Sequence, residues 1–424
     1  MTEHRPHHVL SVLWKNLTDA EGSGDAEAGY VRHNLRILVA GGDGTVTWVL
    51  GTILELGLSP PPAVAVMPLG TGNDFSFNFG WGTKFQWNWV KPDHLYKTLG
   101  MYRKAVPCEM DVWSMTITAP DASYYAQLPY SVHKDKTQPG KVSARFWNYF
   151  SVGLDAEAAY GFHHLRETHP RLTFGPAINQ AWYSVFSCST GWFCGSKPIA
   201  HKLKLRVRSN TTDASDWKEV VVPPSVRAVV LLNLQSYGGG RDIWGLADSS
   251  ATSTFQEPIY DDGCIEVLGF NSGWHTAAVM GQISSKIHAH RLAQCREVEM
   301  ELAATGGAVK GERGIVYMQL DGEPWPQEIP AAAADVPADT KTATSDNNSN
   351  TNVWKSLTML RLGKGRGSVR RRDVEPLRVR VGCGERSTVL VNTKETLGTR
   401  QAKFITQRAV TMSKSLSEAM VAGS

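Results

Sequence analysis

The sequence lacks long apolar runs and has little net charge. No stretch approaches the roughly 18–20 consecutive apolar residues that cross a bilayer, and the polar, His-rich N-terminus has no apolar core of the kind a secretory signal needs. A formal net charge of +4 over 424 residues excludes a strongly basic nucleic-acid binder. We therefore expect a cytoplasmic protein with no nucleic-acid partner and only peripheral contact with a membrane.

Metal-binding and disulfide patterns are also absent. The six cysteines include no C-x-x-C pair, and no Cys/His cluster has the spacing of a zinc site. Scattered cysteines in a chain of this length are typical of reduced thiols in a cytosolic protein. With 42% hydrophobic and 20% charged residues, the composition is that of a globular protein long enough for two domains.

A β-α-β pattern follows an N-terminal extension over 1–34. The apolar run at 35–40 predicts a strand, apolar residues at helical spacing follow from Thr45, and 63–67 predicts a second buried strand. Strand, helix and strand in this order indicate a parallel sheet with a right-handed crossover. We predict an α/β domain over residues 35–110.

A β-rich second domain is predicted over residues 111–330. Its strand-like runs are 110–118, 146–154, 202–208, 226–235, 264–270, 298–302 and 315–325. Asp321-Gly322 in the last run predicts a β-hairpin. One long helical stretch is expected between 156 and 186.

A low-complexity basic insertion is predicted over 331–376, and 377–424 is expected to hold closing strands (377–382 and 387–392) and a tail. Between Trp354 and Arg380, nine Lys or Arg face only two acidic residues. Each cation near an anionic lipid surface is worth about 1 kcal/mol. We expect such a contact through Lys364, Arg366, Arg370, Arg371 and Arg372, and a solvated insertion without a partner is the alternative.

The sharpest motif is GGDGT at 41–45, where the first strand opens into the helix. Unpaired N–H groups at a helix start favour a phosphate, and glycines let the backbone approach a ligand closely. Asp43 would repel phosphate but suits a Mg²⁺ ion, a water on that ion or a ribose hydroxyl. The alternative is a tight strand–helix turn in which Asp43 is the cap.

PLGTGNDF at 68–75 repeats this arrangement after the second strand. Gly70 and Gly72 flank Thr71, and Asn73-Asp74 stand at a predicted helix start. Ligands in open parallel sheets bind at the carboxyl ends of the strands, so we expect both loops to line one cleft. No Walker lysine follows either loop, which excludes a P-loop enzyme.

These motifs resemble those of the eukaryotic-type diacylglycerol kinases. GGDGT followed by PLGTGNDF resembles the family's catalytic domain, and sphingosine, ceramide and NAD kinases share the GGDG loop more distantly. Further segments resemble the accessory domain in the family's order: NYFSVGLDA, FHHLRETHP, AWYSVF, LNLQSYGGGRDIWG, DDGCIEVLGF and QLDGEPWPQ. The resemblance covers most of residues 35–327.

The resemblance implies a phosphofructokinase/NAD-kinase-like α/β domain, a sandwich-like β-rich domain, and Mg²⁺-ATP in the cleft between them. The residues that it implies bind nucleotide are Gly41, Gly42, Asp43, Gly44, Thr45, Gly70, Thr71, Gly72, Asn73 and Asp74. Asp43 is the metal candidate and, together with Asp262, the catalytic candidate.

Asp262 is similar to the general base proposed for this superfamily. Asp261 competes with it, and a plain hairpin Asp-Gly is the alternative interpretation of DDG at 261–263. Asp155 and Asp321 also match family segments, and we interpret both as structural turns.

The implied activity is transfer of the ATP γ-phosphate to the hydroxyl of diacylglycerol at a membrane surface, giving phosphatidic acid. One alternative is a kinase for another lipid, such as a sphingoid base or ceramide. The other is a catalytically weak, membrane-associated regulatory protein. That alternative is motivated by the segment before residue 35, which shows no NPKSGG-type loop like the one that opens family members. C1 zinc modules and EF-hand loops, common in relatives, are absent too.

Overall fold

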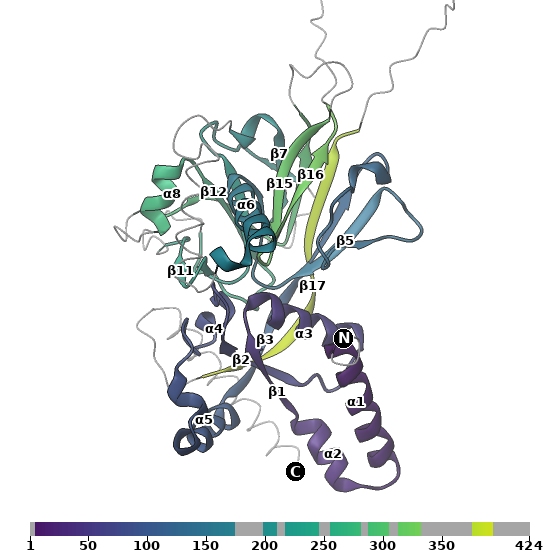
Figure 1. The fold of residues 1–424 in the computed structure, drawn as a ribbon. Coiled ribbons are helices and arrows are strands. Elements are labelled where there is room, and N and C mark those ends of the chain that lie inside the picture. Colours follow the sequence, from purple (N-terminus) through teal and green to yellow (C-terminus); the bar gives the residue numbers. More distant parts are fainter. Residues whose placement is uncertain are drawn as a thin grey trace, which may run out of the picture.

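The computed structural model describes residues 5–173, 198–209, 217–245, 255–280, 287–304, 313–331 and 375–392. Within these ranges the chain forms an α/β unit and a β-rich unit, joined by two long strands (Figure 1). None of the described helices has the length and apolar character needed to span a membrane.

The first unit contains the predicted β-α-β arrangement. Its elements are α1 (Pro6–Gly22), α2 (Ala26–Asn34), β1 (Arg36–Gly41), α3 (Asp43–Glu55), β2 (Ala63–Pro68), α4 (Asp74–Asn78), the 3-10 turn η1 (Trp87–Val90) and α5 (Pro92–Lys104). β1 and β2 pair in parallel over their full lengths, which confirms both predicted strands. Every residue of β2 is buried, as expected for a parallel strand covered on both faces.

The segment before β1 is a pair of helices in the described part of the chain. α1 and α2 pack against each other, and α1 also contacts α3. Arg32 of α2 forms a 2.6 Å ion pair with Glu21 of α1, and Asp25 caps α2 by accepting two backbone N–H groups. Through α1, the described part of the extension therefore supports α3.

Two long antiparallel strands run through both units (Figure 1). β3 (Val106–Thr118) pairs with β17 (Leu377–Val391) along its whole length, with one irregularity between Cys383 and Glu385. β17 is thus one strand where the sequence predicted two, because a bulge and not a break separates the two apolar runs. β3 begins four residues before the predicted start at 110.

The second unit places two sheets face to face. The remaining elements are η2 (Ala122–Tyr124), β4 (His133–Lys134), β5 (Lys141–Phe146), β6 (Tyr149–Gly153), α6 (Leu154–Thr168), η3 (Pro170–Leu172), η4 (Ile199–His201), β7 (Leu203–Arg208), β8 (Lys218–Val220), β9 (Ala228–Leu232), β10 (Ser236–Tyr237), β11 (Arg241–Asp242), β12 (Ile265–Phe270), α8 (Gly273–Met280), β13 (His290–Cys295), β14 (Glu297–Leu302), β15 (Gly314–Leu320) and β16 (Glu323–Ile329). One sheet has the order β4-β5-β3-β17-β14-β7-β8, and β17 also pairs with β2. The other has the order β13-β12-β9-β6-β15-β16.

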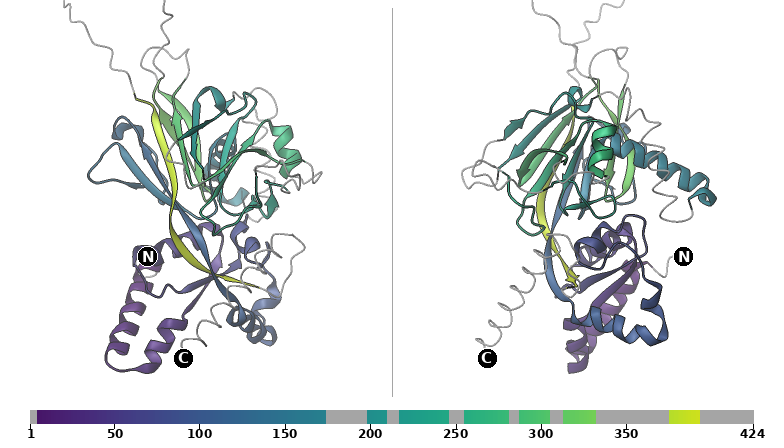
Figure 2. Two further views of the ribbon diagram at one scale, coloured as in Figure 1. Left: turned by 180° about the vertical axis from the view of Figure 1, so that it is seen from behind. Right: turned by 90° about the vertical axis from the view of Figure 1, so that its left-hand side faces the viewer.

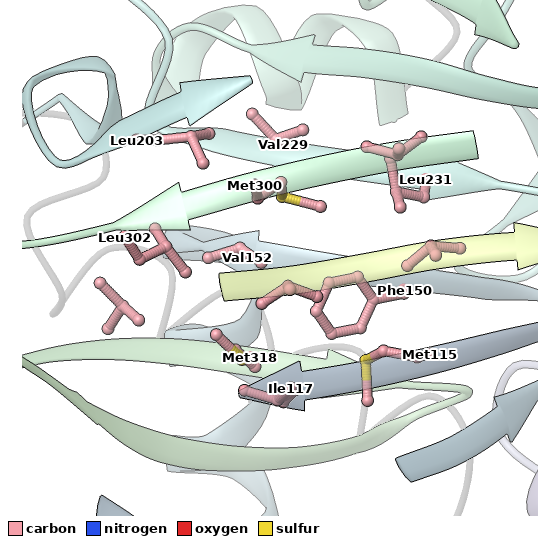
Figure 3. Close-up of a cluster of buried hydrophobic side chains, with 14 of the residues drawn as sticks. Met115, Ile117, Phe150, Val152, Leu203, Val229, Leu231, Met300, Leu302 and Met318 are labelled. Atoms are coloured by element: carbon pink, nitrogen blue, oxygen red, sulfur yellow. The ribbon is translucent and has the colours of Figure 1, made fainter. Parts of the chain in front are cut away.

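Apolar side chains from both sheets form one core between them (Figure 3). Met115 and Met300 come from the first sheet, and Phe150, Leu231 and Met318 come from the second. α6 and α8 lie outside this sandwich, as Figure 2 shows. The helix predicted from 156 to 186 ends at Thr168, two residues before a proline that cannot continue it. Residues 174–197, which include the rest of the predicted stretch, lie outside the described ranges.

Glu266 is a buried acid near the start of β12. Its carboxylate accepts a 3.1 Å hydrogen bond from Gln294, and its second oxygen, Oε2, has no partner among the described residues. Burial raises the pKa of Glu266 well above its ordinary value. The native state therefore keeps this proton at a pH where the unfolded chain releases it, so the stability that the protonated form provides is lost as the pH rises.

We expect Glu266→Gln to flatten the pH dependence of stability. The free energy of unfolding of the wild type should fall relative to the variant by up to about 1.4 kcal/mol per pH unit above the ordinary glutamate pKa. Thermal unfolding at several pH values from about 5 to 8 measures this. The exposed Glu219→Gln is the control, and parallel profiles for wild type and Glu266→Gln would contradict the prediction.

Candidate functional site

Both glycine loops lie at the carboxyl ends of the two parallel strands. β1 ends at Gly41 and β2 ends at Pro68, and these two residues are paired. α3 begins directly after Gly42, and α4 begins directly after Asn73. The two loops therefore meet at one edge of the sheet.

The two loops touch through glycines. A Cβ on Gly70 would lie 2.5 Å from the Cα of Gly42, and a Cβ on Gly42 would lie 2.9 Å from the Cα of Gly70. A side chain at either position would push the loops apart. Gly44 differs, because nothing lies within 4 Å of its Cβ position, and Thr45 beside it is exposed. The start of α3 thus presents its backbone to open space.

Asn73 fixes the shape of the second loop. Its backbone is left-handed, with φ of 55°. Its amide nitrogen donates to the carbonyls of Gly70 and Thr83 at 2.9 and 2.8 Å, and its amide oxygen accepts from the Gly70 N–H at 2.8 Å. The side chain of Asn73 is therefore engaged inside the loop, while Thr71 and Gly72 are half-buried at its tip.

The carboxylate of Asp43 joins the first loop to the second. It accepts the backbone N–H groups of Asp74 at 3.1 Å and Phe75 at 2.9 Å. Asp43 therefore caps α4, whereas the alternative drawn from the sequence made it the cap of its own strand–helix turn. Loss of hydration and the neighbouring Asp74 carboxylate raise the pKa of Asp43 to about 7.

Asp74 connects the first unit to a glycine loop of the second. Its Oδ1 accepts from the Ser236 hydroxyl at 2.7 Å and from two glycine N–H groups of the loop at 2.8 Å. The same loop is anchored to the second unit by Tyr237, whose hydroxyl donates to Asp155 at 2.9 Å. The contacts of Asp74 and Asp155 therefore fix where one unit sits against the other.

Two carboxylate oxygens converge beside Gly72. A Cβ placed on Gly72 would lie 3.2 Å from Oδ2 of Asp43 and 3.3 Å from Oδ2 of Asp74. Mg²⁺ binds through one or two carboxylates together with phosphate oxygens and water, so this pair fits the ion. In the ranges that the structure describes, no group of three or more His, Cys, Asp or Glu side chains could hold a metal. At this place the structure shows two carboxylate oxygens, those of Asp43 and Asp74.

A third carboxylate belongs to the hairpin turn between β15 and β16. Asp321 and Gly322 have φ of 46° and 89°, as a two-residue type I′ turn requires, so the predicted hairpin is confirmed. The Asp321 carboxylate accepts the consecutive backbone N–H groups of Trp147, Asn148 and Tyr149 at 2.9–3.0 Å. It thereby fixes the chain where it passes from β5 to β6.

Asp321 and Asp43 interact electrostatically. Burial raises the pKa of Asp321 to about 7 in spite of its three backbone donors. The negative charge of Asp321 in turn contributes to the raised pKa of Asp43. Two buried carboxyl groups from different units thus have pKa values raised to about 7, and carboxyl pKa values raised this far mark candidates for functional residues.

A cavity of about 540 Å³ lies at this junction. Its wall in the first unit is α3, including Gly44 and Trp48, and its wall in the second unit includes β3, β5 and Asp321. Charged side chains of both signs also line it: Arg5, Glu55, Arg145 and Glu323. The cavity therefore adjoins both the open start of α3 and a carboxyl that titrates near pH 7.

Asp262 lies in the turn before β12 and is not among the residues that line this cavity. Its Oδ1 accepts from the Cys264 N–H at 2.8 Å, which is a local Asx turn. Asp111 of β3 accepts the N–H of the glycine between them at 2.6 Å, and Arg386 lies 3.3 Å from Asp111. The turn is thus packed against the β3–β17 pair, and the catalytic assignment of Asp262 stays a prediction.

The basic residues expected to contact anionic lipid lie outside the described residues: Lys364, Arg366, Arg370, Arg371 and Arg372. That contact also stays a prediction. The sequence interpretation of Asp321 as a structural turn is confirmed, because an Asp-Gly pair between strands is the ordinary signature of a hairpin. That Asp321 also lines the cavity has no signal in the local sequence.

The family models and the curated relatives that match this chain agree with one another. Residues 14–91 match the diacylglycerol kinase catalytic domain, and residues 145–324 match the diacylglycerol kinase accessory domain. Diacylglycerol kinase 4 of Arabidopsis thaliana is 39% identical over 354 residues, which cover 78% of this chain and 70% of that protein. Diacylglycerol kinase zeta of Homo sapiens is 32% identical over 327 residues, which cover 74% of this chain and 31% of that protein.

Among solved structures, a diacylglycerol kinase from Bacillus anthracis str. Sterne is similar over 71% of this chain and 76% of its own, with 17% identity and a TM-score of 0.36.

Proposed function

The chain belongs to the diacylglycerol kinase family, and we propose that it transfers the γ-phosphate of ATP to the free hydroxyl of diacylglycerol. The products are phosphatidic acid and ADP. The observation that carries the proposal for this chain is the junction itself, where a cavity lies between the start of α3 and Asp321, whose pKa is about 7. Beside it, the Asp43 carboxylate, which does not line the cavity, joins the first glycine loop to the second.

The nucleotide phosphates are proposed to lie at the open start of α3. The N–H groups of Gly42 and Gly44 and the dipole of α3 favour an anion there, whereas the N–H of Thr45 donates to the Gly42 carbonyl at 3.0 Å. Asp43 and Asp74 would hold Mg²⁺ through the two oxygens that converge beside Gly72. When bound, the ion neutralises charge that develops on the phosphate oxygens.

The acceptor hydroxyl needs a carboxylate to take its proton. In the proposed step the hydroxyl oxygen bonds to the γ-phosphorus, the bond to the bridging oxygen breaks, and ADP leaves. Asp321 suits the role of base because it lines the cavity and its pKa of about 7 lets it accept a proton near neutral pH. Asp262, to which the family resemblance assigns this role, is the competing candidate.

The two units are proposed to be the catalytic domain, over 35–110, and the accessory domain, over 111–330. The parallel pairing of β1 with β2 supports a phosphofructokinase/NAD-kinase-like first domain, and the two facing sheets support a sandwich-like second domain. We place the protein in the cytoplasm, in peripheral contact with the membrane that carries diacylglycerol.

The test is transfer of labelled phosphate from ATP to diacylglycerol in mixed micelles, with sphingosine as a second acceptor. We expect phosphatidic acid to form in a reaction that needs Mg²⁺, and sphingosine to remain unlabelled. Labelling of sphingosine alone would favour the alternative lipid kinase. A folded protein that binds Mg²⁺-ATP poorly and labels neither lipid would favour the regulatory alternative.

A further inference from the structure

One surface of the first unit exposes large apolar side chains that the site does not use. In η1 and α5, Trp87 is 78% exposed and Tyr96 is 87% exposed. Three aliphatic neighbours, Val90, Leu95 and Leu99, are between 39% and 48% exposed. η1 and α5 are consecutive and contact each other, so these five residues form one surface, here named the η1–α5 patch. Exposed apolar clusters of this kind mark interaction sites.

The apolar outer face of α5 is not needed to hold the helix in place. The inner face does this through Thr98 and Tyr102, both of which are buried. The Tyr102 ring stacks on Trp81 at a centroid distance of 4.3 Å, and its hydroxyl donates to the Val66 carbonyl at 3.3 Å. The helix therefore has a docked face and a second apolar face that lies in solvent.

The exposed Trp87 ring packs against the aromatic ring of Phe85. Phe85 meets the Trp87 ring edge-on at 5.2 Å and the Trp89 ring at 6.1 Å. Phe85 and Trp89 are partly buried against the core of the first unit. The exposed Trp87 side chain is therefore attached to a segment that packs on the core of the first unit.

The segment that carries the patch is rich in positive charge. Residues 84–104 contain five cations, Lys84, Lys91, Lys97, Arg103 and Lys104, and one acid, Asp93. All six are exposed. This short segment has a net charge of +4, which equals the net charge of the whole chain. Tryptophan and tyrosine favour the membrane–water interface, and each nearby Lys or Arg adds about 1 kcal/mol of attraction to anionic lipid.

We propose that the η1–α5 patch inserts into the interfacial layer of an anionic phospholipid membrane. The inference rests on the proposed function, because a kinase acting on diacylglycerol must meet the surface in which that lipid resides.

On the second unit, Trp274 of α8 is 70% exposed. α8 and α5 lie on the same side of the molecule, with α4 and β11 between them (Figure 1), and Figure 2 shows this side face-on. α5 of the first unit and α8 of the second therefore both lie on this side of the molecule.

The test is sedimentation of the full chain with vesicles of phosphatidylcholine containing phosphatidylserine, without nucleotide. Trp87→Ser/Tyr96→Ser/Leu99→Ser should bind about tenfold more weakly than the wild type. Lys91→Glu/Lys97→Glu, which leaves the apolar residues in place, should weaken binding similarly and reduce its salt dependence. Tyr30→Ser is the matched control, because Tyr30 is 67% exposed on α2 outside the patch.

Activity separates this inference from the proposed function. The patch variant should phosphorylate a water-soluble short-chain diacylglycerol like the wild type and phosphorylate vesicle-borne diacylglycerol about tenfold more slowly. If the wild type phosphorylates neither the short-chain nor the vesicle-borne diacylglycerol, the kinase proposal is refuted. The vesicle-binding measurement then still tests the patch, because it does not depend on activity. Equal vesicle binding by wild type and both folded patch variants would overturn the inference. So would a wild-type dimer that the patch variant converts to a monomer, because the patch would then be a contact between two copies.

Discussion

Replacing Asp43 with asparagine is expected to lower kcat for diacylglycerol phosphorylation by about 100- to 1,000-fold, the usual cost of removing one electrostatic contact to a reacting group. The substitution keeps the side-chain shape but removes the charge that would hold Mg²⁺ between Asp43 and Asp74. It also weakens the contacts to the N–H groups of Asp74 and Phe75. Loss of such a cap costs about 1 kcal/mol of stability, so the variant should stay folded.

The effect of Asp43→Asn should be specific to the metal-bound nucleotide. Titration calorimetry with ATP, with and without Mg²⁺, should show that the ion strengthens binding to the wild type much more than to the variant. The exposed Asp19→Asn on α1 is the control and should bind and react like the wild type. If a folded Asp43→Asn protein keeps the wild-type kcat and the same effect of Mg²⁺ on ATP binding, Asp43 is not part of the site.

Asp321→Asn is expected to lower kcat by about 100- to 10,000-fold, the range over which general acid–base groups contribute. Because burial raises the pKa of Asp321 to about 7, the carboxylate is protonated below that pH and cannot take the hydroxyl proton. The kcat of the wild type should therefore rise as the pH increases through about 7. This rise should be smaller in the residual activity of Asp321→Asn, where Asp43 is the remaining carboxyl of the pair with a raised pKa.

Asp262→Asn is the matched comparison for Asp321→Asn. If Asp321 is the base, Asp262→Asn should keep most of the activity and the same pH profile, because the Asp262 side chain caps a turn outside the cavity. The opposite result, with loss only in Asp262→Asn, would establish the assignment drawn from the family resemblance. Thermal unfolding of both variants is needed, since Asp321 also accepts three backbone N–H groups.

The sequence determined the β1–α3–β2 unit and the positions of both glycine loops. Their signals are local: a short buried strand, glycines, then apolar residues at helical spacing. The hairpin at Asp321-Gly322 was equally predictable, because the turn requires positive φ at both positions. The order of the motifs was also sufficient to identify the family, since it depends on residue identity and not on geometry.

Only the tertiary structure decided which carboxylates lie within electrostatic reach of one another. Asp43 and Asp321 are far apart in the chain, and their mutual electrostatic effect depends on how the two units pack. Asp43 caps α4 and not its own helix, which no local pattern indicates because helix capping is normally read from adjacent residues. The continuity of β17 across Cys383–Glu385 likewise depends on β3, whose backbone pairs with both of its halves. Patterns along the chain specify helices, strands and turns. Burial and charge pairing between distant residues arise only when these elements pack. The pKa values near 7 of Asp43 and Asp321 and the cavity between the units could therefore not be derived from the sequence.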